Sequence, residues 1–440
     1  MNQKTVAVIG AGPAGLFAAK TLAEKDVKVA LFNRDVRPGG LAEYGIYPEK
    51  TSLKKGLRRQ FMSFLSHKNI TYFGNMEIGE NKDLSLAQLR AMGFQGILIA
   101  AGAQKLRELK VEGEFLPRVY HAWEIVSKYN DLPPYSQIDY PIGKKVLIVG
   151  VGNVMADVAR YLLQKGDVEE ILVIARRGPA EIKFHETEFA HIAQNLDRAD
   201  FEAEMERVTS LMLKLGQDPN ATWAFIEKAC ENCDEKTSSA NLRLRFLKSP
   251  VQFLGNENEG LQEVKCVENT LVEENHVMKT VPTSLHALFD VDTAILAVGS
   301  SVDDEMGLPV SDDLFTVSPY PDYPQDGISY EVMDPVLEKN ISGIFLAGWS
   351  RLASYGLVGI SGKDGMKGAH AAYEFLQEQD IDCPDWQVLE SKILDSKKTV
   401  VNKNMVDQLY ALEAEIAQKK GLADYKFAAN QEMLAAVGLV

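Results

Sequence analysis

The stretch "TVAVIGAGPAGLFAAKTLAEKDVKVALFN", residues 5–33, decides the fold of the N-terminal part of the chain. Its apolar start predicts a strand, its Ala- and Leu-rich middle predicts a helix, and residues 27–33 predict a second strand. A strand–turn–helix–strand unit is the usual beginning of a parallel sheet covered by helices. The alternation continues with a helix at 52–68, a strand at 70–74, a helix at 84–92 and a strand at 97–102.

The turn of this unit contains a GxGxxG fingerprint formed by Gly10, Gly12 and Gly15. In a dinucleotide-binding fold the first Gly makes the tight turn, the second lets a pyrophosphate approach the backbone, and the third packs helix against strand. The helix N-terminus adds free N–H groups and a partial positive charge. An acidic residue normally ends the second strand and binds the ribose, but here this position is Asn33. We therefore expect nucleotide binding with a weaker ribose contact.

The same order of elements begins again about 140 residues later. A strand, a turn containing Gly150 and Gly152, a helix and another strand occupy residues 144–176. The third position of this fingerprint is Met155 instead of Gly or Ala, so helix and strand are expected to lie slightly further apart. This internal repeat predicts a second dinucleotide-binding domain.

Two adjacent arginines, Arg176 and Arg177, stand at the tip of the last strand of this repeat. A carboxylate at this place selects the free 2′-hydroxyl of NADH, whereas arginine accepts a 2′-phosphate through charge-assisted hydrogen bonds. Two arginines with no acid at the tip favour NADPH, and the alternative interpretation is a solvated basic strand end. Two nucleotide folds, the second for NADPH, suggest a flavoprotein reductase with FAD in the first.

At this point several segments resemble the adrenodoxin-reductase-type ferredoxin–NADP reductases, from about residue 5 to about residue 435 and in the order of that family. They are "GPAGLFAA", "GGLAEYGIYPE", "HAWEIVSKYN", "GNVMADVAR", "ARRGPAEIKFHETEF", "FLKSPVQFLG" and "LAGWSRLASYGLVGISGKD". The resemblance implies hydride transfer from NADPH to FAD, followed by release of single electrons to a ferredoxin-like or flavodoxin acceptor.

The fold class expected from these features is α/β, with two Rossmann-like dinucleotide-binding domains of the glutathione-reductase type. The FAD-binding domain is expected to be discontinuous, comprising residues 1–105 and residues 326–440 with C-terminal helices. The NADPH-binding domain, residues 106–325, is expected to be inserted between the two parts. Within it, residues 196–240 are polar, acidic and helical and are interpreted as an insertion.

The resemblance also implies roles for individual residues. The FAD would contact Gly10, Gly12, Ala14, Gly15, Asn33, Gly40, Leu41 and Ile78. The NADP pyrophosphate would contact Val151, Gly152, Asn153 and Val154. The 2′-phosphate would be held by Arg176 and Arg177, with Glu188 on the adenosine side. The isoalloxazine ring would lie against Trp349, Gly356, Leu357 and Val358, and Gly356 would also touch the nicotinamide.

Three departures from the family pattern concern proton transfer. Lys50 stands where the family has a histidine that assists hydride transfer, and His191 stands where it has a glutamate. The family's "GTNxxDA" is here "GISGKDG", residues 359–365. No catalytic acid or base is therefore assigned, and His191 is interpreted as a histidine on a helix face.

A C-x-x-C motif, Cys230-Glu-Asn-Cys233, has two interpretations. It is a redox dithiol, as in some flavin reductases, or it has no redox role. The motif lies in the polar insertion, where no flavin is expected, and this favours the second interpretation. Cys266 and Cys383 are far away in sequence, so we expect no zinc site and no other metal.

The composition fits a protein of two or more domains, with 440 residues and a net charge of −15. This charge argues against general nucleic-acid binding, and no segment predicts a membrane span or a signal peptide, so a cytoplasmic location is expected. Residues 1–60 nevertheless carry a net charge of +6. A basic cluster in one predicted helix, Lys54, Lys55, Arg58 and Arg59, is interpreted as a docking face for a small acidic ferredoxin or flavodoxin. A solvated helix face is the alternative.

Other classes of protein stay open. A glutamate-synthase-type small subunit would have a Cys-rich iron–sulfur segment before the first fingerprint, which this sequence lacks. A thioredoxin-reductase-like enzyme would need its dithiol at the flavin. A nucleotide-sensing interaction protein with impaired turnover is suggested by Lys50 and His191.

Overall fold

The chain divides into two compact units in the computed structural model. The described residues are 3–236, 238–275, 277–354, 356–379 and 384–440. The first unit comprises Met1–Leu106, Ser127–Gln137 and Gly299–Val440, and the second comprises Arg107–Val126 and Ile138–Val298. Helix α5 (Ala122–Tyr129) contributes residues to both units. No helix in the described part of the chain is long and apolar enough to cross a membrane.

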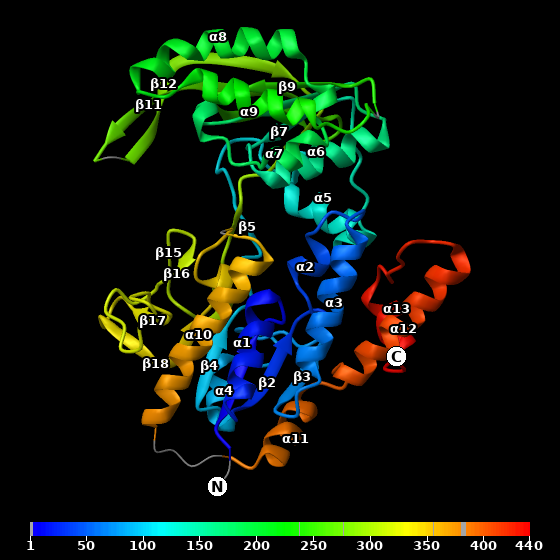
Figure 1. Cartoon of the computed structure of the whole chain (residues 1–440), viewed down its shortest axis with the longest axis vertical. Helices are drawn as coiled ribbons and strands as arrows, with labels where there is room; N and C mark the ends of the chain where they lie inside the picture. The colour runs from blue at the N-terminus through cyan, green and yellow to red at the C-terminus, as the bar shows by residue number, and fades with distance from the viewer. Residues whose placement is uncertain (1–2, 237, 276, 355, 380–383) are drawn as a thin grey trace. The chain divides into compact units, whose positions relative to one another are not determined.

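The first unit is built on a six-stranded sheet with the order β17-β18-β4-β1-β2-β3 (Figure 1). All neighbouring strands are parallel except the antiparallel pair at the β17 edge. The strands are β1 (Thr5–Ile9), β2 (Lys28–Asn33), β3 (Ile70–Gly74), β4 (Gly96–Ile99), β17 (Glu331–Asp334) and β18 (Lys339–Leu346). Short strands outside this sheet are β5 (Lys105–Leu106), β14 (Ser300–Ser301), β15 (Val310–Ser311) and β16 (Leu314–Phe315).

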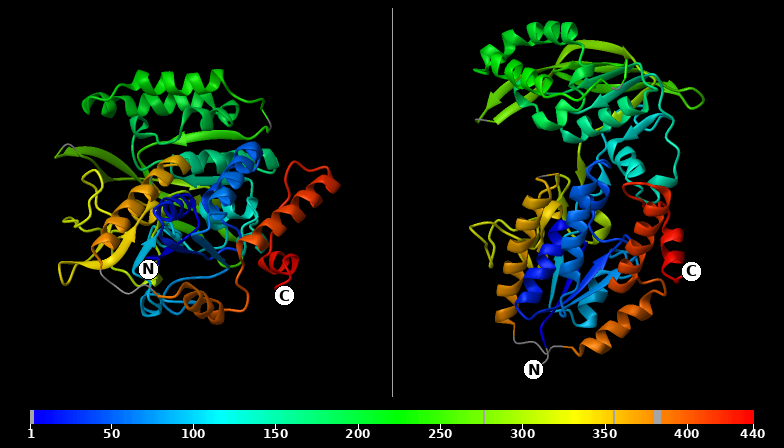
Figure 2. Two further views of the ribbon diagram at one scale, coloured as in Figure 1. Left: turned by 60° about the horizontal axis from the view of Figure 1, so that its bottom comes forward. Right: turned by 45° about the vertical axis from the view of Figure 1, so that its right-hand side comes forward.

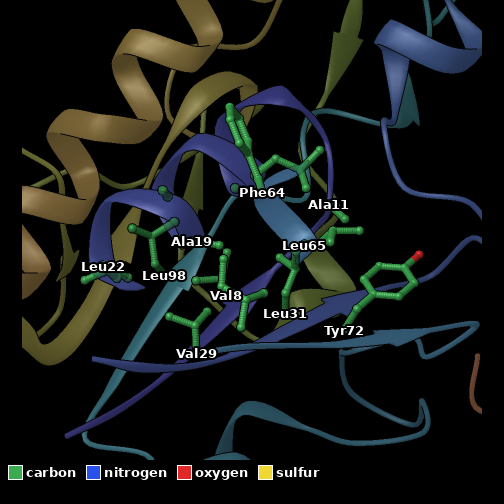
Figure 3. Packing of buried hydrophobic residues seen from close by; sticks show 14 of the residues in the cluster. Val8, Ala11, Ala19, Leu22, Val29, Leu31, Phe64, Leu65, Tyr72 and Leu98 are labelled. Carbon is green, nitrogen blue, oxygen red and sulfur yellow. The ribbon is translucent and has the colours of Figure 1, made fainter. Parts of the chain in front are cut away.

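Apolar clusters cover both faces of this sheet. Because side chains alternate along a strand, Val8 of β1 packs into one cluster and Ile9 into the other. Figure 3 shows the first cluster, in which Val8, Leu31 and Leu98 of the sheet meet helical side chains. The helices of this unit are α1 (Pro13–Glu24), α2 (Leu41–Tyr44), α3 (Thr51–Leu65), α4 (Leu86–Met92), α10 (Val358–Glu378), α11 (Trp386–Ser396), α12 (Lys403–Lys420) and α13 (Asn430–Ala436). The right-hand view of Figure 2 shows α12 and α13 alongside α3.

The second unit contains a parallel five-stranded sheet with the order β6-β13-β7-β8-β9. An antiparallel sheet of β10, β11 and β12 adjoins it in sequence. The strands are β6 (Val119–His121), β7 (Lys145–Val149), β8 (Glu170–Ile174), β9 (Asn241–Arg245), β10 (Lys248–Asn256), β11 (Gly260–Glu274), β12 (Val277–Asp290) and β13 (Thr293–Leu296). The helices are α6 (Asn153–Lys165), α7 (Glu186–Ala190), α8 (Arg198–Lys214) and α9 (Pro219–Glu231). The predicted α/β class, with two strand–turn–helix repeats on parallel sheets, is confirmed.

The second unit ends earlier than the sequence predicted. The chain returns to the first unit at Gly299, whereas the predicted domain continued to residue 325. Strand β14 pairs with β5, and the side chains of Val302 and Met306 are buried in the same apolar cluster as Ile9. These residues therefore complete the core of the first unit. The strands in this segment are too short to show a hydrophobic pattern, so the sequence alone did not assign the segment to the first unit.

Helix α10 contains several glycines. It starts at Val358 and includes Gly362 and Gly365 in its first half. A Cβ atom at Gly365 would lie 2.1 Å from the carbonyl oxygen of Ala14 in α1. These glycines are therefore used for close helix–helix approach and do not mark a loop.

Candidate dinucleotide-binding sites

The first Gly-rich turn is constrained on two sides. Gly10 has φ +100° and donates its N–H to the carbonyl of Phe32 at 2.8 Å. A Cβ atom at Gly10 would lie 2.4 Å from the carbonyl oxygen of Ala100, and one at Gly15 would lie 1.8 Å from that of Gly10. The first and third glycines of the fingerprint therefore allow strand β1, the turn and helix α1 to approach this closely.

The middle glycine of this turn is different. Gly12 is the N-cap of α1 with extended backbone (φ −76°, ψ −178°), and Pro13 begins the helix. A Cβ atom at Gly12 would meet no described atom within 4 Å. Gly40 lies next to it, since a Cβ atom there would be 3.0 Å from the Gly12 Cα. The space in front of the helix N-terminus is thus open at the position where a pyrophosphate would approach the backbone.

The second unit repeats this geometry. Gly150 has φ +121°, donates its N–H to the Ile174 carbonyl at 2.9 Å, and has no room for a Cβ, which would lie 2.3 Å from the Ala297 oxygen. Gly152 is extended (φ −109°, ψ −179°), and a Cβ atom there would meet no described atom within 4 Å. Met155 is fully buried behind the turn. Both units therefore offer an open N-terminal cradle that fits a dinucleotide.

Asn33 has a structural role that the sequence did not predict. Its Oδ1 accepts the N–H of Ala11 at 3.1 Å, and its Nδ2 donates to the carbonyls of Asp35 and Arg37, each at 2.8 Å. The buried amide therefore ties the Gly-rich turn to the loop after β2. Because both ends of this amide already have partners inside the protein, the structure does not favour the expected ribose contact.

The other residues expected at the first cradle lie in different environments. Ala14 is buried, and Gly348 approaches it so closely that a Cβ at Gly348 would lie 2.6 Å from the Ala14 Cβ. Leu41 starts α2 and is partly exposed. The side chain of Ile78, in contrast, is buried in an apolar core cluster.

The turn between β18 and α10 presents the residues expected at the isoalloxazine ring. Trp349 donates its Nε1–H to the carbonyl of Gly356 at 3.3 Å, and Gly356 has φ +77°. Leu357 is the N-cap of α10, and its side chain is 66% exposed, while Val358 is the first helical residue. An indole and an exposed aliphatic side chain at a helix N-terminus suit an apolar ring system with polar edges.

Asp364 is a site residue that sequence reasoning missed. Its carboxylate accepts the N–H of Gly348 at 2.6 Å and the hydroxyl of Tyr330 at 3.0 Å, and it forms an ion pair with Arg351. Burial raises the pKa of Tyr330, so this hydroxyl stays a donor. Asp364 thus fixes the turn that carries Trp349. The signal was the carboxylate in "GISGKD", which the sequence comparison treated only as a departure from a family motif.

The residues around the second turn hold it against the following loop. The Val151 carbonyl accepts the N–H of Lys183 at 3.0 Å, and the Asn153 Oδ1 accepts the N–H of His185 at 2.8 Å. Val154 is 45% exposed on the first turn of α6. The Asn153 side chain therefore holds the loop after β8 in place, and the backbone at the start of α6 faces the open cradle.

Arg176 and Arg177 lie just past the end of β8, as predicted. Arg176 is exposed, and its carbonyl accepts a hydrogen bond from the Asn269 amide at 3.1 Å. Arg177 is half-buried, and its Nε lies 3.7 Å from the Glu181 Oε2. The structure therefore adds a carboxylate to a strand tip that the sequence analysis described as free of acids.

Glu188 and His191 lie close together in sequence but have different surroundings. Glu188 is half-buried in the short helix α7. His191 follows this helix, and its Nδ1 lies 2.6 Å from the Asp234 Oδ2. This ion-pair geometry gives His191 a structural partner within the second unit.

The cysteines of the C-x-x-C motif are free thiols at the C-terminal end of α9. Both belong to the second unit, whereas the first cradle belongs to the first unit. Burial raises the pKa of Cys230, which lowers its reactivity as a thiolate. Cys383 lies outside the described residues. Among the described residues, no group of three or more His, Cys, Asp or Glu side chains is arranged to hold a metal ion.

The predicted basic docking cluster on α3 is corrected by the structure. Lys54 is 2% exposed, and its Nζ donates to the Asn130 Oδ1 at 2.6 Å. Burial lowers the pKa of Lys54 to about 7. Arg58 is paired with Glu43 at 2.6 Å and with Asp424 at 3.0 Å. Neither residue is therefore a free surface cation.

The ion pairs around α3 explain why its run of basic residues gave a wrong prediction. Arg37 and Glu413 form a buried ion pair, and Lys426 lies 3.4 Å from the Glu43 carboxylate. The anions come partly from the C-terminal segment, more than 300 residues away in sequence. Only Lys55 and Arg59 of the predicted cluster are exposed, and the Lys55 Nζ donates to a backbone carbonyl of that segment.

Comparisons with known proteins agree with this geometry. Residues 4–209 match the family of pyridine nucleotide-disulphide oxidoreductases. The chain is 25% identical over 408 residues to the NADPH-ferredoxin reductase FprA of Mycobacterium tuberculosis (strain H37Rv), covering 83% of this chain and 82% of that protein. It is 25% identical over 393 residues to the mitochondrial NADPH:adrenodoxin oxidoreductase of Arabidopsis thaliana, covering 80% and 78%. The solved structure of M. tuberculosis FprA in complex with NADPH has the same fold, with a TM-score of 0.81 at 21% identity over 99% of each chain.

Replacing Gly12 with Val tests the first cradle. The backbone at Gly12 is extended and the site is open, so that Gly12→Val should fold, but its side chain would fill the space needed by a pyrophosphate. We expect the purified variant to lose its flavin absorption. Gly56→Val is the matched control, because a Cβ at Gly56 also meets no described atom within 4 Å but lies on α3. A folded Gly12→Val protein that keeps its flavin would place the flavin elsewhere.

Proposed function

We propose that the chain, which is similar to NADPH-ferredoxin reductases and NADPH:adrenodoxin oxidoreductases, transfers hydride from NADPH to FAD and then electrons singly to an iron–sulfur protein. It is an NADPH-dependent oxidoreductase whose cofactors are FAD and NADP(H). The observation that supports this function best is the pair of open cradles at Gly12 and Gly152, of which only the second is followed by paired arginines.

We assign FAD to the first unit. The N-terminus of α1 would bind its pyrophosphate, and the turn held by Asp364 would present Trp349 and the backbone of Leu357 to its ring. These groups are fixed by the fold before the cofactor arrives, which lowers the entropic cost of binding. Bound FAD supplies the chemistry that accepts a hydride and releases electrons one at a time.

We assign NADP(H) to the second unit. The N-terminus of α6 would bind the pyrophosphate, and Asn153 would keep the loop that follows β8 in place through its bond to His185. Arg176 and Arg177 would hold the 2′-phosphate. The remaining task of the protein is to place the nicotinamide against the flavin ring, for which orientation matters more than acid–base groups. No proton-transferring residue is required by this assignment.

We further propose that the acceptor is a small acidic ferredoxin or flavodoxin. Iron–sulfur partners are named for the reductases that the chain resembles. Lys55 and Arg59, which are the exposed members of the α3 cluster, would attract an acidic partner at long range. The two other members would instead hold α3 in place, Arg58 against Asp424 of the C-terminal segment and the buried Lys54 against Asn130.

The double substitution Arg176→Ala and Arg177→Ala tests the coenzyme assignment. Each lost charge-assisted bond to the phosphate should cost about 1.5–3 kcal/mol, so NADPH binding should weaken at least tenfold. NADH lacks this phosphate, so its affinity should change little. Lys165→Ala, at the far end of α6, is the control in the same unit. Equal losses for NADPH and NADH, measured by titration calorimetry, would contradict the assignment.

Charge reversal on α3 tests the docking face. Lys55→Glu together with Arg59→Glu should slow reduction of the best acceptor at low salt and leave flavin reduction by NADPH intact. The difference should fade as salt rises, because exposed charges beyond about 10 Å are screened at about 0.1 M. The control is Lys419→Glu with Lys420→Glu, two cations in the last turn of α12. If the rate of acceptor reduction changes neither with the charge reversal nor with the salt concentration, α3 is not the docking face.

A further inference from the structure

The loop that carries the two arginines also carries a carboxylate. The Glu181 Oε2 lies 3.7 Å from the Arg177 Nε, and the side chain of Glu181 is only 15% exposed. Neither of these two atoms makes a hydrogen bond with any described residue. The pair is therefore close enough for strong attraction but is not locked by a hydrogen bond. The terminal nitrogens of Arg177 are the atoms that remain to meet a phosphate.

The residues on both sides of Glu181 line a pocket of about 290 Å³. Pro179, Ala180 and Ile182 contribute to this lining together with Phe184 and Phe225. The remaining lining residues are Gln217, Asp218, Ala221 and Thr222. Because the Glu181 side chain is only 15% exposed, its charge is less screened than a charge in bulk water.

The loop has protein packed behind it. A Cβ atom at Gly178 would lie 3.6 Å from the Leu271 Cδ1 of β11 and 3.9 Å from the Gln217 Oε1. The Gln217 Oε1 is itself buried and has no hydrogen-bond partner among the described residues. Gly178, three residues before Glu181, therefore lies close to β11 and to Gln217.

The pKa of Glu181 reflects these surroundings. Burial raises the pKa of the carboxyl group, while Arg177, Lys183 and Arg176 act in the opposite direction. A second negative group at Arg177 would add to the cost of keeping this carboxylate charged.

A carboxylate and an arginine at this strand tip have opposite preferences. In dinucleotide folds the carboxylate binds the 2′-hydroxyl of NADH, and the arginine binds the 2′-phosphate of NADPH. A phosphate monoester carries a charge of about −1.5 to −2 at neutral pH. If Arg177 holds such a phosphate, the phosphate and Glu181 share one guanidinium as like charges.

We propose that Glu181 is a specificity-determining residue, whose carboxylate opposes the 2′-phosphate at Arg177 and narrows the preference of the protein for NADPH over NADH. This inference rests on the proposed NADP site of the second unit. Glu181 weakens NADPH binding by repulsion and leaves NADH binding unopposed. Specificity is a difference of affinities, and a repulsive group changes it as effectively as an attractive one.

Binding of two adenosine nucleotides to the flavin-loaded protein tests the inference without turnover. The probes are adenosine 2′,5′-bisphosphate, which carries the 2′-phosphate, and adenosine 5′-monophosphate, which does not. Glu181→Gln should bind the bisphosphate about five- to tenfold more tightly than the wild type, the size expected for removing one like charge from a partly screened site. The monophosphate should bind equally to both. Glu181→Asp keeps the charge and should restore the wild-type ratio.

The outcomes separate two claims. If Glu181→Gln binds the bisphosphate with unchanged or lower affinity, the repulsive role of Glu181 is overturned, because the carboxylate then only positions Arg177 or does nothing. If the wild type binds the bisphosphate no more tightly than the monophosphate, and Arg176→Ala does not change either affinity, the 2′-phosphate site of the proposed function is itself contradicted. Equal melting temperatures of the Gln and Asp variants would show that a change in the ratio of the two affinities does not come from unfolding.

Discussion

The close approach of backbone to backbone at the first glycine of each fingerprint is the constraint on which the structure depends. At Gly10 and Gly150 a Cβ atom would lie within 2.4 Å of a carbonyl oxygen of the neighbouring strand end. Any larger residue would push the turn away from the sheet and move the helix that follows. The helix N-termini point into open space only because these turns are so tight. In the first unit Gly365 also has no room for a Cβ atom, and this lets α10 pack directly on α1.

The two copies of the turn differ at the end of the strand that follows the helix. In the first unit the last residue of β2 is Asn33, whose side-chain amide bonds to backbone groups and holds the turn in shape. In the second unit the adjacent arginines Arg176 and Arg177 lie just past the end of β8, and the Arg176 side chain is exposed. The paired arginines, and not the glycine pattern, therefore separate the two proposed nucleotide sites.

The sequence predicted what is local and failed where distant segments meet. The two Gly-rich turns, their strands and the position of Arg176 follow from short patterns, and the structure confirms them. The contact of the buried Lys54 with Asn130 and the pairing of Arg58 with Asp424 involve segments that no local pattern connects to α3. Likewise, Glu181 was visible in the sequence, but its proximity to Arg177 requires the bend of the loop after β8.

The central claim is that NADPH reduces a flavin held by the first unit and that an iron–sulfur protein then receives the electrons. An anaerobic titration of the purified protein with NADPH, followed by addition of oxidised ferredoxin, tests it most directly through the visible absorption of the flavin. We expect NADPH to bleach the flavin band and ferredoxin to restore it while becoming reduced. A protein that carries no flavin, or whose flavin band does not respond to NADPH, would contradict this function.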